Sequence, residues 1–390
     1  MRLFLPFLLA LLVLALLLQV GIFVTVVYFL IAVYVLSRLW VRHSVDHLRL
    51  DRSFLNRAFL GDSVEVTVHI SNTSRVPVPW VEITDSVPTD LRATAPATHV
   101  VTLGMRDRKH FTYRLKCGKR GYYLLGPFYL STGDLLGVEQ EELTMWKTDG
   151  LIVYPRVVSL DRLGLQALAP QAALAATSPL IEDPARVMGV REYQRGDSPR
   201  RIHWTATARL AQLVVRQYEP TISRETMIFL DLDSGHYEHP HDGTEMGIVA
   251  AASFANHIVT REKLSVGLVT EAIDPLADGE SRRITLLPRT GRGQLISILE
   301  ILARAGMTKG TAFAEALRQQ SVRLPWGASI LAITGERSVE LLETLLFLRR
   351  GGFAVSLILV RPFGSRQPTE PEQVGIPVRV VRIDRDLGLV

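Results

Sequence analysis

A long apolar run at the N-terminus constrains this chain more than any other feature. Leu3 to Leu36 is almost unbroken hydrophobic sequence, with Gln19 and Thr25 as its main polar interruptions. As one helix the run would be about 50 Å long, which exceeds the roughly 30 Å hydrocarbon core of a bilayer. Divided near Gln19–Gly21, it gives two helices of about 16 residues, each close to the lower limit for a membrane span. The run therefore predicts a transmembrane helical hairpin within residues 1–40.

The charges around this run favour a hairpin with both ends in the cytoplasm. Positive residues lie on both flanks: Arg2 before the run, and Arg38, Arg42, Arg49 and Arg52 after it. Positive flanks stay on the cytoplasmic side, so we expect a multi-pass protein of the inner (plasma) membrane whose soluble domains face the cytoplasm. A signal peptide is one alternative, although the run is too long for one. A single strongly tilted span is the other, and it would place the two positive flanks on opposite sides.

The segment from 48 to 155 changes to the two-residue period of β-strands. Val64, Val66, Val68 and Ile70 alternate with mostly polar residues, and turn signals such as Gly126-Pro127 recur throughout. Many short strands with this spacing predict an immunoglobulin-like β-sandwich. We find no catalytic constellation in it, and such a domain more often spaces or binds than catalyses. The following residues, 156–185, are rich in Ala, Leu and Pro and are expected to form a linker.

An arginine-rich segment, residues 186–225, contains the densest cluster of polar and aromatic residues. The candidate residues for binding a partner or an anion are Arg191, Asp197, Arg200, Arg201, Trp204 and Arg209. Asp197 or Ser198 can cap a helix that has Pro199 in its first turn and continues to about Ala211, followed by a strand from Leu213 to Tyr218.

Two roles are open for these arginines. The structural one is pairing with Glu192, Asp197 and Glu219, because the guanidinium fork suits bidentate contacts with carboxylates. The functional one is presentation of the same fork to a phosphate or an acidic protein surface. Nucleic acid is not expected as a partner, because the charge is local and lacks a lysine ladder with interleaved aromatic residues. The net charge of +5 instead fits an anionic membrane surface.

The sequence VREYQRGDSPRRIHWTATARL resembles the signature of the DUF58 family of membrane-associated bacterial and archaeal proteins. The resemblance rests on Arg191-Glu192-Tyr193, Gly196-Asp197, Pro199-Arg200-Arg201-Ile202, Trp204 and Ala208-Arg209. It implies a membrane hairpin, a β-rich domain, the signature and a C-terminal domain similar to von Willebrand factor A. It also implies a partner, because such proteins are typically encoded beside MoxR-type AAA+ ATPases and transglutaminase-like membrane proteins.

The C-terminal segment, 226–390, alternates strand and helix patterns. The expected strands are Met227–Leu232, Leu264–Thr270, Arg283–Leu287, Ala328–Thr334, Phe353–Val360 and Val378–Ile383. The expected helices are Thr244–Thr260, Leu295–Leu302, Thr311–Gln319 and Ser338–Arg350. This alternation predicts a Rossmann-like parallel sheet covered on both faces, whose ligands bind at the carboxyl ends of the strands.

That edge carries Asp231, Asp233 and Thr311, which are hard oxygen ligands of the kind that Mg²⁺ prefers. The resemblance to von Willebrand A domains implies an adhesion-type metal site with two serines and a later aspartate. Here Asp233 and Gly235 replace the serines, and Gly335 or Glu336 stands near the missing aspartate, so we expect a metal-free fold. The nearby His236, His239 and His241 match no zinc spacing and are expected to be solvated.

Together these features predict a membrane-anchored, non-enzymatic adaptor that binds protein partners, without catalytic residues and without a cofactor. The chain lacks the Gly-x-Ser-x-Gly, His-Glu-x-x-His and Walker A motifs. Its one cysteine, Cys117, cannot form an intrachain disulfide. The alternative is a divalent-metal-dependent hydrolase that uses the Asp231 and Asp233 edge.

Overall fold

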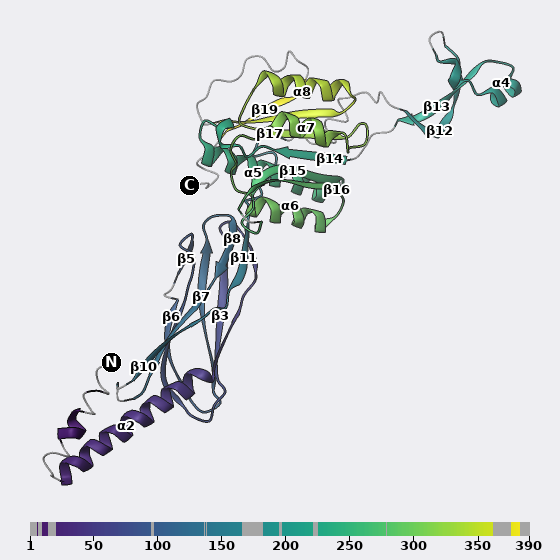
Figure 1. Ribbon diagram of the computed structural model, residues 1–390. Coiled ribbons are helices and arrows are strands. Elements are labelled where there is room, and N and C mark those ends of the chain that lie inside the picture. Colours follow the sequence, from purple (N-terminus) through teal and green to yellow (C-terminus); the bar gives the residue numbers. More distant parts are fainter. Residues whose placement is uncertain are drawn as a thin grey trace. The chain divides into compact units, whose positions relative to one another are not determined.

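The computed structural model describes residues 6, 10–14, 21–94, 97–135, 137, 139–165, 182–194, 197–220, 225–277, 279–361 and 376–382. The chain divides into two compact units, Met1–Tyr154 and Pro155–Val390 (Figure 1). The first predicted membrane span lies mostly outside the described residues, so the hairpin remains a prediction.

Helix α2 (Gly21–Asp46) is the second half of the predicted hairpin. Among the described residues it is the one helix long and apolar enough to cross a membrane. The sequence pattern ended this helix near Leu36, but the helix continues to Asp46 because its last turns pack against the β-rich domain. The Ser37 hydroxyl donates to Asp134 Oδ2 at 2.6 Å, and Trp40 Nε1 donates to the Pro77 carbonyl at 3.0 Å.

The rest of the first unit consists of three sheets. The first has the order β1 (Leu48–Ser53), β3 (Ser63–Asn72), β7 (Arg108–Cys117) and β5 (Leu91–Ala93). The second has the order β10 (Gln140–Met145), β9 (Phe128–Gly133), β4 (Val78–Asp85) and β6 (Thr98–Leu103). The third joins β2 (Arg57–Phe59), β11 (Asp149–Tyr154) and β8 (Gly121–Leu125).

These sheets enclose one apolar core, which makes the domain β-sandwich-like. The predicted alternation is confirmed along β3, where Val64, Val66, Val68 and Ile70 are buried while the residues between them are more exposed. Buried side chains from all three sheets belong to the same core cluster. The two-residue period therefore places every second side chain of these strands in the core.

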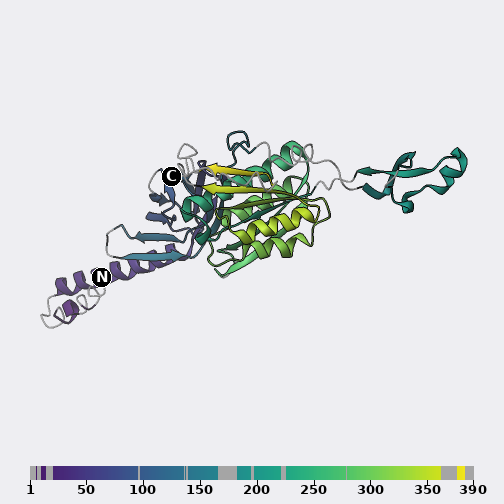
Figure 2. The same cartoon turned by 90° about the horizontal axis from the view of Figure 1, so that it is seen from above.

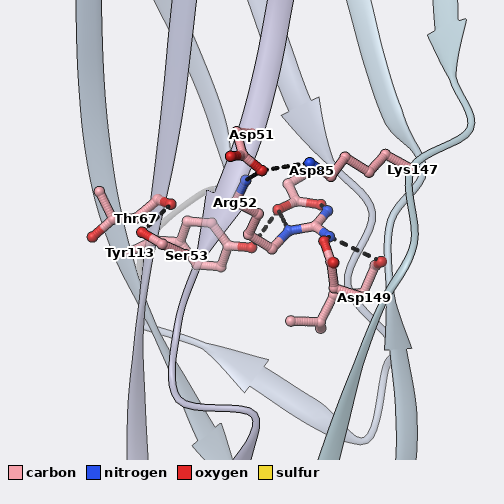
Figure 3. A network of polar contacts seen from close by, with 9 residues as sticks. Asp51, Arg52, Ser53, Thr67, Asp85, Tyr113, Lys147 and Asp149 are labelled. Carbon is pink, nitrogen blue, oxygen red and sulfur yellow. Dashed lines mark hydrogen bonds and ion pairs between the residues drawn. The ribbon is translucent and has the colours of Figure 1, made fainter.

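A buried ion network crosses this core and overturns one expectation. Arg52, expected among the positive charges beside the membrane, points inward with its side chain fully buried. Its Nε and Nη2 donate to the two carboxylate oxygens of Asp85 at 2.9 and 2.5 Å, and Nη1 donates to Asp149 at 2.7 Å (Figure 3). The Tyr113 hydroxyl also donates to Asp85, at 2.5 Å. Arg52 is thus a structural tie between β1, β4 and β11 and contributes no charge to the surface.

The second unit contains a six-stranded sheet in the order β16 (Ser281–Arg289), β15 (Ser265–Ile273), β14 (Glu225–Leu230), β17 (Ser329–Thr334), β18 (Ala354–Arg361) and β19 (Val378–Arg382). The strands are parallel except β16, which pairs antiparallel with β15 at the edge. The helical segments are η3 (Ser234–His236), α5 (Pro240–His257), η4 (Ile258–Glu262), α6 (Arg292–Arg304), α7 (Phe313–Ser321) and α8 (Val339–Arg350). The expected alternation of strand and helix is confirmed, with the antiparallel edge as a correction.

Helices flank this sheet (Figures 1 and 2). Met227 and Phe229 of β14 share a core cluster with Leu317 of α7 and with the apolar face of α8. The other face of the sheet meets α5, where Leu230 approaches Gly247 closely. The predicted cap of α8 is also confirmed, because Ser338 Oγ accepts the Leu341 amide at 3.2 Å.

The arginine-rich segment forms a separate hairpin of β12 (Glu182–Glu192) and β13 (Val214–Pro220). The single helix predicted from Pro199 to Ala211 is wrong. A 3₁₀ turn, η2 (Pro199–Arg201), is followed by extended backbone at Ile202, and α4 (Trp204–Leu210) begins only after His203. The reason is a bridge between Ile202 and Val215 of β13, which requires extended backbone at that position.

Candidate functional site

The carboxyl end of β14 delivers two buried carboxylates to the edge of the α/β sheet. Asp231 and Asp233 follow β14 directly and are 2% and 3% exposed. The Ser234 amide donates to the Thr308 carbonyl at 2.9 Å, and the Thr308 amide donates to the Leu232 carbonyl at 2.9 Å. The loop between α6 and α7 is therefore held against this edge, as expected for neighbouring connections of a parallel sheet.

Asp231 is surrounded by donors from three segments. Its Oδ1 accepts the Asp233 amide at 3.0 Å. Its Oδ2 accepts the Thr334 hydroxyl at 2.7 Å, from the end of β17, and lies 2.7 Å from Nδ1 of His236. These contacts fix the orientation of the Asp231 carboxylate at the sheet edge.

Asp233 binds the segment that precedes α7. Its Oδ2 accepts the Thr311 amide at 2.6 Å and the Thr311 hydroxyl at 3.3 Å, while its Oδ1 accepts the Gly235 amide at 2.8 Å. Burial acts to raise the pKa of Asp233, but these backbone donors outweigh it and the pKa is lowered. The structure thus brings together Asp231, Asp233 and Thr311, the three residues that the sequence suggested for a metal.

His236 is held between two acids. Its Nδ1 faces Asp231, and its Nε2 lies 2.9 Å from Oε2 of Glu336. The hydrogen bond to Asp231 raises the pKa of His236 to about 9, although burial opposes the shift. At neutral pH the imidazolium therefore donates to both carboxylates. This arrangement corrects the expectation that His236 is solvated, whereas the expectation holds for His239 and His241, which are exposed.

Tyr237 fixes the loop that carries His236. Its ring lies against Gly243 and Gly335, where an added Cβ would collide with the ring. Its hydroxyl donates to the Asp231 carbonyl at 2.6 Å. Gly335, which stands near the missing metal-binding aspartate, is therefore required for close packing.

The donor set does not fit Mg²⁺ as it stands. Each carboxylate oxygen of Asp231 and Asp233 already accepts a hydrogen bond from this chain, and the imidazolium of His236 already supplies positive charge. A hard divalent cation would have to compete with the His236 imidazolium for the same carboxylate, and two positive charges so close together repel each other. Within the described ranges, no group of three or more His, Cys, Asp or Glu side chains is arranged to hold a metal ion.

The hairpin holds the other candidate residues. Arg191 and Asp197 form a bidentate pair, with Nη1–Oδ2 at 2.8 Å and Nη2–Oδ1 at 2.6 Å. The hydrogen bonds from Arg191 and from the Gln194 amide lower the pKa of Asp197. The structural role proposed for arginine is thus confirmed at this one pair.

Three further candidate residues of the hairpin lie on its surface. Trp204, the first residue of α4, is 67% exposed, and Arg201 and Arg209 are also exposed. The side chain of Arg200 lies outside the described residues. None of the side chains of α4 is buried, so this helix presents its aromatic and basic residues outward.

The sequence contained signals for two groups that were missed. Leu48, Leu50 and Arg52 alternate along β1, so the two-residue period already turns Arg52 toward the core. For His236 the signal was its spacing of five residues from Asp231, which a tight 3₁₀ turn brings together.

Comparisons with known proteins agree with the resemblance in part. A family model described as "Protein of unknown function DUF58" matches residues 189–327. The uncharacterized protein YeaD of Bacillus subtilis (strain 168) is 26% identical over 231 residues, which cover 56% of this chain and 56% of that protein. The match therefore spans little more than half of the relative's length.

Solved structures match only part of the chain. The CARDB domain of a Pyrococcus furiosus protein is 18% identical with a TM-score of 0.21, covering 27% of this chain and 91% of that domain. Escherichia coli alpha-2-macroglobulin is 15% identical with a TM-score of 0.25, covering 29% of this chain and 7% of that chain. Scores at this level do not establish a shared fold.

Proposed function

We propose that this protein is a membrane-anchored scaffold that binds a partner protein through its second unit. The observation that carries the proposal is the closed polar edge formed by Asp231, Asp233 and His236. A hydrolytic metal site keeps an open position for water or substrate. At this edge each carboxylate oxygen of Asp231 and Asp233 instead accepts a hydrogen bond from the same chain, which suits a rigid recognition surface.

The anchor is α2, the second half of the predicted hairpin, and its exposed apolar side chains support this role. Ile22, Phe29 and Leu36 are 81%, 66% and 64% exposed. Arg38 and Arg42 follow the most apolar part of the helix, and positive charges favour the cytoplasmic side. We therefore place both units in the cytoplasm of a multi-pass inner-membrane protein.

The α/β domain is, in this proposal, von Willebrand A-like with a degenerate adhesion site. The convergence of Asp231, Asp233 and Thr311 at one edge supports it, since the resemblance implies these positions. The His236 imidazolium stands beside the carboxylates in place of a metal ion. Such a domain binds proteins through this edge, with Glu336 as its partly exposed acid.

The partner suggested by the resemblance is a MoxR-type AAA+ ATPase that acts on membrane or envelope complexes. The hairpin supports protein binding, because exposed Trp and Arg side chains are typical anchors of protein interfaces. Trp204 and Arg209 are the pair we expect to contribute most.

Quantitative co-purification from native membranes tests this function. The tagged full-length chain should enrich an AAA+ ATPase, and the Trp204→Ala/Arg209→Glu variant should lose most of that enrichment. Trp146→Ala/Arg292→Glu is the matched control, because both residues are exposed and lie outside the hairpin. Equal recovery of the ATPase with both variants, or no enriched ATPase with the unchanged chain, would contradict the proposal.

A further inference from the structure

A basic pocket lies on the outer face of the β1–β3–β7 sheet, close to the point where α2 ends. Its volume is about 310 Å³, and its lining includes Arg49, His69, Ser71, Arg108 and His110. The pocket belongs to none of the sites described above.

Strand register brings these side chains together. Arg49 of β1 pairs with Ser71 of β3, which pairs with Arg108 of β7. One step along the same face, His69 of β3 pairs with His110 of β7. Directly opposed residues of neighbouring strands have Cβ atoms about 5 Å apart. Two guanidinium groups therefore flank one hydroxyl, with two imidazoles beside them.

Within the described residues, the two arginine side chains of this pocket are not paired with an acid. Arg49 Nη1 donates only to the carbonyls of Asp46 and Leu48, at 3.2 and 3.1 Å. The side chain of Arg108 has no hydrogen bond or ion pair within the described residues. The one acid of the lining, Asp51, is paired with Lys147. Guanidinium groups in this state suit a phosphate, which they can bind through two parallel hydrogen bonds.

The position of the pocket indicates which phosphate it meets. A membrane span needs about 20 residues, so a span that begins at Gly21 ends near Trp40. From Trp40 to Asp46 the helix rises about 9 Å, and only His47 separates α2 from β1. Arg49 therefore lies within roughly one Debye length of the apolar boundary, at the depth of the lipid headgroups.

Loops at the same end of the domain fit a membrane surface. The loops before β4 and before β7 are joined by a hydrogen bond from the Arg106 amide to the Ser74 carbonyl at 3.0 Å. They carry the exposed residues Arg75, Met105 and Arg106. Leu135, in the turn after β9, is 79% exposed. Apolar tips among arginines are typical of surfaces that rest on an anionic bilayer.

We propose that this pocket binds the phosphate headgroup of an anionic phospholipid in the leaflet that α2 leaves. This inference rests on the proposed membrane anchor. The headgroup would hold the sandwich against the bilayer and would select anionic over zwitterionic lipid.

Native mass spectrometry of the full-length chain in uncharged detergent tests the site. The unchanged protein should bind phosphatidylglycerol in preference to phosphatidylcholine. Arg49→Gln/Arg108→Gln should weaken phosphatidylglycerol binding about 30-fold, since each basic residue near a surface contributes about fivefold. Arg92→Gln/Arg114→Gln is the matched control, because it removes two exposed arginines from the distal end of the same sheet. The control should keep the lipid preference.

Three results would overturn the assignment: an unchanged preference in Arg49→Gln/Arg108→Gln, an equal loss in the control, or displacement of the lipid by equimolar inorganic phosphate. Flotation with neutral phosphatidylcholine vesicles separates the anchor from the site. All variants should float, because α2 alone holds the chain in the bilayer. Failure of the unchanged protein to float would refute the anchor, whereas loss of lipid preference with normal flotation concerns the pocket alone.

Discussion

Replacing Arg52 by Met should be the most damaging single change in the β-sandwich-like domain. Methionine keeps much of the side-chain volume but removes the guanidinium, which donates to both oxygens of Asp85 and to Asp149. It also removes the charge 4.3 Å from the centre of the Phe128 ring. The Asp85 carboxylate would then remain buried, with the Tyr113 hydroxyl as its remaining side-chain donor among the described residues.

The burial of the ion pair determines how much unfolding free energy Arg52→Met should lose. The side chains of Arg52 and Asp85 are both 0% exposed, and removing one partner of such a pair costs about 3–5 kcal/mol because a buried charge is left uncompensated. A domain stability of about 5–15 kcal/mol would lose a large fraction. Asp85→Leu in the Arg52→Met background should recover part of the loss, because an apolar pair of similar size replaces the buried ions.

Hydrogen exchange of the full-length chain in detergent, measured against urea concentration, resolves the two units. Peptides from β3 and β7 should lose protection at much lower urea in Arg52→Met, while peptides from β14 should keep theirs. Arg49→Met on the same strand is the control, since Arg49 is exposed. A loss of less than about 1 kcal/mol in Arg52→Met, comparable to a surface ion pair, would refute this account of the network.

Three further predictions concern the Asp231 edge. The pKa of His236 is raised to about 9 from an ordinary 6.5, so the stability that His236 gives the folded domain is complete below pH 6.5 and is lost as pH rises through 9. This contribution amounts to up to about 3 kcal/mol in urea unfolding, and His236→Gln should abolish its pH dependence. An unchanged pH profile in the variant would contradict the prediction. Gly335→Ala should destabilise the α/β domain by about 1–3 kcal/mol because its methyl group collides with a ring. Gly293→Ala, in open space within α6, should leave the thermal midpoint unchanged or raise it slightly, because alanine has the higher helix propensity. Millimolar Mg²⁺ should leave the thermal midpoint unchanged, and a concentration-dependent rise that Asp233→Asn removes would show a metal site instead.

Patterns with a clear period predicted the elements of the structure well. The apolar strand of β17 and the Ser338 cap of α8 follow from local chemistry alone. The single helix after Pro199 failed because the bridge between Ile202 and Val215 is a tertiary contact that no local pattern reveals. The strand at Arg283–Leu287 was predicted and is part of β16, but its antiparallel direction was not predicted, since direction depends on the connection and the pairing partner.

The residues of the site were predicted, but the hydrogen bonds between them were not. The sequence placed Asp231, Asp233 and Thr311 at one edge because strand ends of a parallel sheet converge. It could not place His236, whose contact with Asp231 depends on a turn fixed by the Tyr237 ring. It also misplaced Arg52, because a charged residue near a membrane segment was assumed to be exposed.

The connection between α2 and β1 has a mechanical consequence. Only His47 separates α2 from β1, and Ser37 and Trp40 of α2 are hydrogen-bonded to the domain. We therefore expect the helix and the domain to move as one rigid body. A thinner or thicker bilayer changes the tilt of a spanning helix. In the proposed anchor, such a tilt would therefore turn the β-sandwich-like domain together with α2.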